Sequence, residues 1–140
     1  MTEELKKILL DFGNNKEPFL THNHLYTADL SDGTATVVLP MCEVSLNRWG
    51  GAHGGILFSL CDVATGMAIM SVRQEKVVTV NASIDYLAAA SAGSTLTAVG
   101  RVDRIGGKLA FCSAEITDET GNVVVRSHTV MCFTGKKLEL

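Results

Sequence analysis

The longest apolar stretch of the chain runs from Ile56 to Val72 and fades near Arg73. Its length of about 17 residues is at the lower limit for crossing a bilayer, and the polar residue Asp62 lies inside it. We therefore predict a core helix and no membrane span. Because this helix is apolar nearly all round, other elements must cover it on most sides.

From Lys76 onward the hydrophobic pattern has a period of two, which is typical of a half-buried strand. The apolar positions of that strand are Val78, Val80, Ala82, Ile84 and Tyr86. Three more strands are predicted at about 94–104, 107–118 and 122–134. Turn residues separate them at 106–107 and 119–122.

The first part of the chain predicts a short amphipathic helix followed by two strands. Leu5, Ile8 and Phe12 are at helical spacing, with Thr2 as N-cap and Gly13 at the end. Residues 14–21 are interpreted as a connection and residues 41–52 as irregular. Strands are predicted at 24–30 and 34–40, joined by a turn at 31–33.

These elements favour an α+β fold in a single domain, residues 1–140. Strands joined by short turns pair antiparallel, and a helix that is apolar all round needs a curved sheet to cover it. We therefore predict one antiparallel sheet wrapped around a long central helix, with a short helix at the N-terminus. The composition, 46% hydrophobic and 19% charged, fits a globular protein.

Charge and cysteine usage exclude several classes. The net charge of -3 argues against a nucleic-acid partner. The four cysteines contain no C-x-x-C pair, so we predict no metal site. The N-terminus does not have the pattern of a signal peptide, so we expect reduced thiols and a cytoplasmic location.

The segment GGAHGGILFSLCD, residues 50–62, carries the candidate chemistry. Gly54 and Gly55 at a helix N-terminus would expose backbone N–H groups that favour a developing negative charge. The alternative is that they only let the chain turn into the helix. Asp62 favours the functional interpretation, because an unpartnered carboxylate among apolar neighbours is costly unless it serves as a general base or nucleophile.

The spacing of these groups predicts an oligomer. Gly54 and Asp62 are separated by about 12 Å along a helix, too far to act on the same carbonyl group. His53 lies on the opposite face from Asp62. A two-fold dimer with antiparallel helices would bring the Gly54 end of one subunit to Asp62 of the other.

The pattern Asn47-x-x-Gly50-x-x-His53-Gly54-Gly55 followed by Asp62 resembles the hotdog-fold acyl-CoA thioesterases of the phenylacetyl-CoA thioesterase type. The resemblance covers residues 34–134. It implies that Gly54 donates its N–H to the thioester carbonyl and that Asp62 of the partner subunit is base or nucleophile.

The resemblance implies further roles around this centre. Asn47 and His53 would position the water, the thioester or neighbouring loops, and Thr79 would help to hold the attacking water. Gly55 would contact the substrate. No metal or organic cofactor is implied, and the expected assembly is a dimer or a homotetramer built as a dimer of dimers.

Coenzyme A carries phosphates, which an acidic protein must hold with local basic residues. Arg101, Arg104 and Lys108 cluster around the turn at 106–107, and the resemblance implies that they meet these phosphates. A cluster of this kind can also be only a solvated surface.

Two other functions compete with thioester hydrolysis. An acyl-thioester hydratase needs a histidine base beside the helix acid, and His53 is poorly spaced for that role. An acyl-CoA-binding or sensing module without turnover is the second alternative. The apolar residues near the helix permit aromatic and aliphatic acyl groups alike.

Overall fold

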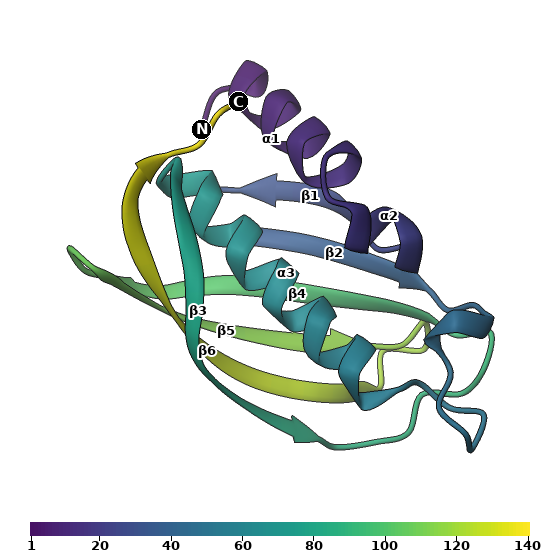
Figure 1. Cartoon of the computed structure of the whole chain (residues 1–140). Helices are drawn as coiled ribbons and strands as arrows, with labels where there is room; N and C mark the ends of the chain where they lie inside the picture. The colour runs from purple at the N-terminus through teal and green to yellow at the C-terminus, as the bar shows by residue number, and fades with distance from the viewer.

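The computed structural model describes residues 1–140 and has one antiparallel sheet that curves around a long central helix (Figure 1). The sheet order is β1-β2-β4-β5-β6-β3, which confirms the predicted architecture. The elements are α1 (Glu3–Asn15), α2 (Pro18–Asn23), β1 (Tyr26–Ser31), β2 (Thr34–Pro40), the 3-10 helix η1 (Glu43–Ser45), α3 (Gly54–Val72), β3 (Glu75–Tyr86), β4 (Thr95–Ile105), β5 (Leu109–Thr117) and β6 (Val123–Lys137).

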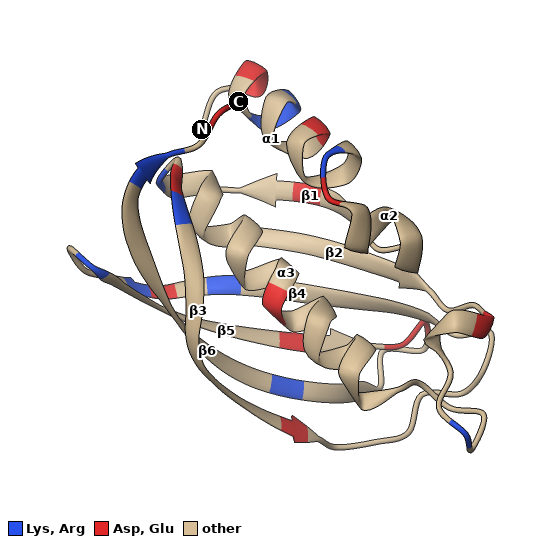
Figure 2. Cartoon of the chain, in the orientation of Figure 1, with Lys and Arg blue, Asp and Glu red and all other residues tan.

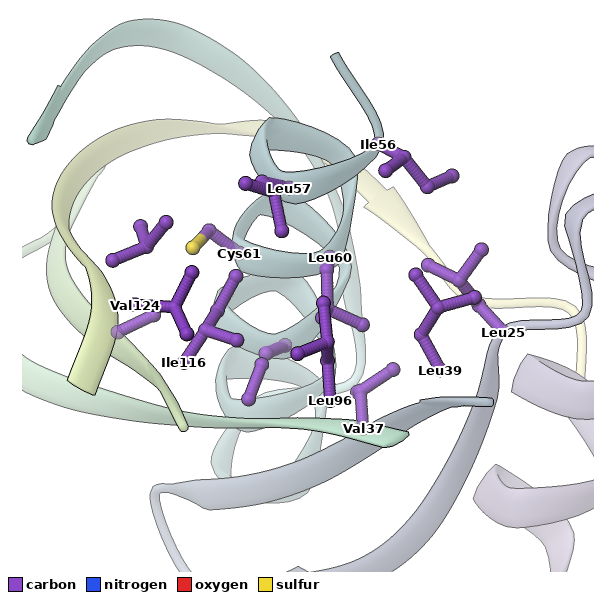
Figure 3. Close-up of a cluster of buried hydrophobic side chains, with 14 of the residues drawn as sticks. Leu25, Val37, Leu39, Ile56, Leu57, Leu60, Cys61, Leu96, Ile116 and Val124 are labelled. Carbon is purple, nitrogen blue, oxygen red and sulfur yellow. The ribbon is translucent and has the colours of Figure 1, made fainter. Parts of the chain in front are cut away.

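The main core lies between α3 and the concave face of the sheet (Figure 3). Leu60 of α3 is fully buried together with Leu96 of β4 and Ile116 of β5. Burial of each such side chain contributes about 1.5–3 kcal/mol. By length and composition α3 could cross a membrane, and more than half of it is buried inside the protein.

Helix α3 and the sheet approach each other closely at Gly100 of β4. A methyl group added there would lie 2.4 Å from the carbonyl carbon and oxygen of Ala64. Side-chain atoms do not approach backbone atoms so closely, so only glycine fits. The backbone of α3 therefore rests directly on the backbone of β4.

The N-terminal part of the chain contains a helix that we did not predict. The Thr2 hydroxyl caps α1 as expected, accepting the Leu5 N–H at 3.1 Å. The prediction that residues 14–21 form a connection was wrong, because they contain the end of α1 and most of α2, which is too short to produce a periodic pattern. The C-cap residue of α2, His24, is in the left-handed conformation (φ 63°), and the first strand starts at Tyr26 and not at residue 24.

Strand β3 is an edge of the sheet and contains a bulge. Its pairing with β6 shifts by one residue between Thr79 and Asn81. Val77 and Thr79 consequently face α3, whereas Val78 and Val80 are 53% and 55% exposed. The prediction that Val78 and Val80 belong to the buried face was wrong, because a bulge reverses the alternation of a strand.

Candidate active site

Helix α3 begins with the segment that the sequence singled out. His53 is the N-cap, in extended conformation, and its Nδ1 accepts the backbone N–H of Gly55 at 2.8 Å. This hydrogen bond satisfies one of the free N–H groups at the helix N-terminus. The Gly55 N–H is therefore occupied by His53 and is not the free donor that the sequence predicted.

The N–H of Gly54 has no hydrogen-bond partner within the subunit. It is the first residue of α3, where the helix dipole adds a partial positive charge. The Gly54 carbonyl oxygen accepts the Tyr86 hydroxyl at 3.0 Å, so the end of β3 holds this residue in place. Gly54 thus presents one free donor to an incoming oxygen atom.

Asn47 organises the loop that precedes α3. Its Oδ1 accepts the N–H groups of Trp49 (2.8 Å) and Gly51 (3.2 Å), and its Nδ2 donates to the Ala52 carbonyl at 3.3 Å. All of its side-chain hydrogen bonds go to this loop. Asn47 therefore orients the approach to Gly54, which is one of the roles that the resemblance implied for it.

Asp62 is the only charged residue of α3 (Figure 2). The Thr79 hydroxyl donates to its Oδ1 at 2.6 Å. Asp62 is half-buried, not fully enclosed as its apolar neighbours in the sequence suggested, because α3 leaves this side open between β3 and the α1–α2 corner. The second carboxylate oxygen makes no hydrogen bond within the subunit.

Separate pockets adjoin the two groups. A pocket of 640 Å³ opens beside Gly54 and is bounded by the loop after β3 and by Leu57. A second pocket of 190 Å³ lies beside Asp62. Because the two residues are about 12 Å apart along α3, a single subunit does not bring donor and carboxylate to one reacting atom.

The two buried thiols of the chain do not supply a nucleophile, and no group of side chains forms a metal site. Burial raises the pKa of Cys61 to about 11 and that of Cys112 to about 12, so neither thiol supplies a thiolate at neutral pH. No three His, Cys, Asp or Glu side chains are grouped as a metal site. The carboxyl groups of Asp62 and Glu17 line the smaller pocket, and Asp62 is the one that lies on α3.

A sequence model of the thioesterase superfamily matches residues 50–125, which include Gly54, Asp62 and Thr79. The chain belongs to the thioesterase superfamily. The resemblance that the sequence alone suggested is thereby confirmed.

Individual relatives agree with the superfamily assignment. The acyl-coenzyme A thioesterase PaaI of Escherichia coli is 33% identical over 107 residues, covering 76% of this chain and 71% of that protein. A Pseudomonas aeruginosa protein named as an esterase is 38% identical over 82 residues; the match covers 57% of this chain and 61% of that protein's length.

Solved structures place the superfamily member among hotdog folds. The structure of the Escherichia coli PaaI protein covers 98% of this chain and 99% of that chain with a TM-score of 0.90, at 23% identity. A hypothetical thioesterase from Streptococcus pneumoniae, crystallised with coenzyme A, has a TM-score of 0.77 and 32% identity, and covers 81% of this chain and 91% of that chain.

The basic residues predicted to meet the CoA phosphates lie away from both pockets of the thioesterase subunit. Arg101 is on the outer face of the sheet, since Gly100 beside it faces α3. Arg104 and Lys108 are exposed at the β4–β5 hairpin. Their role stays a prediction, and within one subunit they are not part of the site.

Sequence reasoning missed two contributors to this site. Tyr86 was interpreted only as an apolar neighbour, and its hydroxyl holds Gly54. Glu17, at the start of α2, lines the same pocket as Asp62. Nothing in the local sequence indicates either contact, because each joins segments far apart along the chain.

We expect Thr79→Val to reduce kcat by roughly 10- to 100-fold, because a hydrogen bond to a charged acceptor is worth about 1.5–3 kcal/mol. Valine suits a strand, so the melting temperature should change little. Steady-state kinetics and thermal unfolding measure both effects. Ser83→Ala, on the same strand, is the matched control and should keep full activity; an unchanged kcat in Thr79→Val would make the hydrogen bond purely structural.

Proposed function

We propose that the protein hydrolyses acyl-CoA thioesters to the free acid and CoA. The observation that carries this proposal is the pairing on one helix of a free N–H at Gly54 and an open carboxylate at Asp62. The superfamily match, a relative named as an acyl-coenzyme A thioesterase and a neighbouring structure with coenzyme A support it.

In the proposed reaction the Gly54 N–H binds the thioester carbonyl oxygen and stabilises the oxyanion that forms there. Asp62 acts as general base, taking a proton from a water molecule that attacks the carbonyl carbon, or as nucleophile. In the first case the carbon–sulfur bond breaks and the CoA sulfur leaves with the proton that Asp62 took up. In the second case Asp62 displaces CoA as a thiolate, and water then hydrolyses the resulting mixed anhydride, which releases the acid and restores the carboxylate. Thr79 keeps one carboxylate oxygen oriented, so the other faces the water or the substrate.

We infer that the complete site combines two subunits. The edge strand β3 offers unpaired backbone groups and exposes Val78 and Val80. Exposed apolar side chains on a free edge favour pairing with a second copy. A two-fold axis at β3 would set the Gly54 end of one α3 beside Asp62 of the other. The assembly is then a dimer or a dimer of dimers.

Release of CoA thiol from a panel of acetyl-, hexanoyl-, palmitoyl- and phenylacetyl-CoA tests the proposal. We expect a continuous rise in free thiol for at least one of these substrates, with equal amounts of acid and CoA as products. A sensing module would bind an acyl-CoA without thiol release. A hydratase would alter the acyl chain and leave the thioester intact, and either result would contradict thioester hydrolysis.

A further inference from the structure

Glu17 is a carboxyl group with no structural partner. It occupies the N-cap position of α2, yet its side chain makes no capping hydrogen bond. It also forms no salt bridge with any of the basic residues of the chain. A side chain that contributes neither a cap nor an ion pair at this place is available for a ligand.

Glu17 and Asp62 line the same pocket although they lie far apart along the sequence. Apart from Thr79 the other lining residues are apolar or glycine: Val63, Gly66, Met67, Met70, Val77 and Met131. Burial, and after it the charge of Asp62, raises the pKa of the Glu17 carboxyl above its ordinary value. Glu17 as a whole is exposed, and its side chain borders this largely apolar pocket.

The dimensions of the pocket fit a short acyl chain. Its volume of 190 Å³ has room for about six groups the size of a water molecule at about 30 Å³ each. Methionine side chains adapt their shape to a flexible apolar ligand. An acyl group whose carbonyl carbon is beside Asp62 would extend along these walls toward Glu17.

We propose that this pocket receives the acyl group and that Glu17 selects its distal end, favouring chains that carry a hydrogen-bond donor there and rejecting chains that end in a carboxylate. The inference rests on the proposed thioester hydrolysis. A distal hydroxyl donates to the Glu17 carboxylate, whereas a distal carboxylate meets a like charge in a site of low polarity. Glu17 is thus a specificity-determining residue that touches the substrate but not the reacting atoms.

Three CoA esters of equal chain length separate the effects: hexanoyl-CoA, 6-hydroxyhexanoyl-CoA and adipyl-CoA. For the wild type we expect kcat/KM to fall in the order hydroxylated, unsubstituted, carboxylated. Glu17→Gln should raise the adipyl-to-hexanoyl ratio of kcat/KM by about tenfold or more and reduce the preference for the hydroxylated ester. The hexanoyl-CoA value itself should change little.

Two variants serve as controls. Glu4→Gln removes an exposed carboxylate on α1, which is not part of this pocket, and should leave all three ratios unchanged. Glu17→Asp keeps the charge and should still discriminate against adipyl-CoA. Because the Glu17 side chain makes no hydrogen bond in the fold, thermal unfolding of Glu17→Gln should match the wild type.

Calorimetric binding of the corresponding thioether analogues gives the same comparison without turnover. If the wild type hydrolyses no ester but the analogues bind with the expected ratios, the proposed hydrolysis fails and the pocket assignment stands. If esters are hydrolysed and Glu17→Gln leaves the ratios unchanged, or lowers all three rates equally, the selectivity role of Glu17 is overturned.

Discussion

Asp62→Asn is expected to lower kcat by about 10²–10⁴-fold while the protein keeps its fold, because an amide cannot accept a proton as a general base does. The asparagine oxygen can still accept the Thr79 hydroxyl, so the only hydrogen bond of the Asp62 side chain within the subunit survives. Thiol release with the best substrate of the acyl-CoA panel measures the loss. Circular dichroism and thermal unfolding check the fold.

Asp85→Asn is a suitable control for this substitution. Asp85 is exposed on β3 beyond the bulge and lies opposite Arg126 of β6 in the strand register. It should retain wild-type activity. An Asp62→Asn protein that keeps more than about a tenth of the wild-type rate would assign Asp62 a structural role and remove the basis of the mechanism.

The second large effect concerns two inactive proteins that restore activity when combined. Gly54→Pro removes the N–H proposed to bind the oxyanion, and loss of one such donor costs about 2.7–4 kcal/mol, or 10²–10³-fold in kcat. Asp62→Asn removes the carboxylate. Each variant alone should be nearly inactive, and a mixture unfolded and refolded together should regain activity.

The local geometry makes Gly54→Pro a fair test. Proline is well tolerated at the first position of a helix, and the N–H it removes has no partner within the subunit. His53 before it has φ -66° and ψ 133°, a conformation that a following proline favours. A Cβ at Gly54 would be 3.4 Å from the Tyr86 hydroxyl, an ordinary contact. Gly54→Ala, which keeps the N–H, should stay active.

The activity of the mixed dimer distinguishes sites shared between two subunits from sites contained in one subunit. If Gly54 of one chain acts with Asp62 of the other, one site of a mixed dimer carries both lesions and the other carries none. Each mixed dimer should then approach half the wild-type rate. If both groups acted within one chain, every site would carry one lesion. Mixed dimers isolated by two affinity tags that remain inactive would refute the shared site, but not thioester hydrolysis.

For strand β3 the sequence predicted the strand itself, but not which of its first side chains face α3. Its alternation correctly predicted a half-buried strand, and the structure puts Ala82, Ile84 and Tyr86 in one register with β6. The bulge after Thr79 could not be predicted, because it depends on pairing with β6 and not on the local pattern. It turns Thr79 toward Asp62, whereas unbroken alternation would have put it on the polar face with Asn81.

The helix N-terminus shows the same limit. The pattern His-Gly-Gly correctly predicted the helix start, but of the two N–H groups expected to be free only that of Gly54 lacks a partner within the subunit. Which N–H remains free depends on the rotamer of His53, because its Nδ1 accepts a hydrogen bond from the Gly55 N–H. The position of Glu17 depends on how the connection between α1 and α2 lies beside α3, and α2 itself is too short to produce a periodic pattern.

The contact of Gly100 with α3 ties the position of the carboxylate to the sheet. Ala64 and Thr65, the residues that touch β4 at this point, follow Asp62 within one turn of the helix. Gly100 has no side chain, so α3 can lie close to β4. The distance between α3 and the sheet in turn fixes the position of Asp62 relative to Thr79. We therefore expect that substitutions in the proposed acyl pocket leave the spacing of Asp62 and Thr79 unchanged, whereas any side chain at Gly100 would displace α3 and alter it.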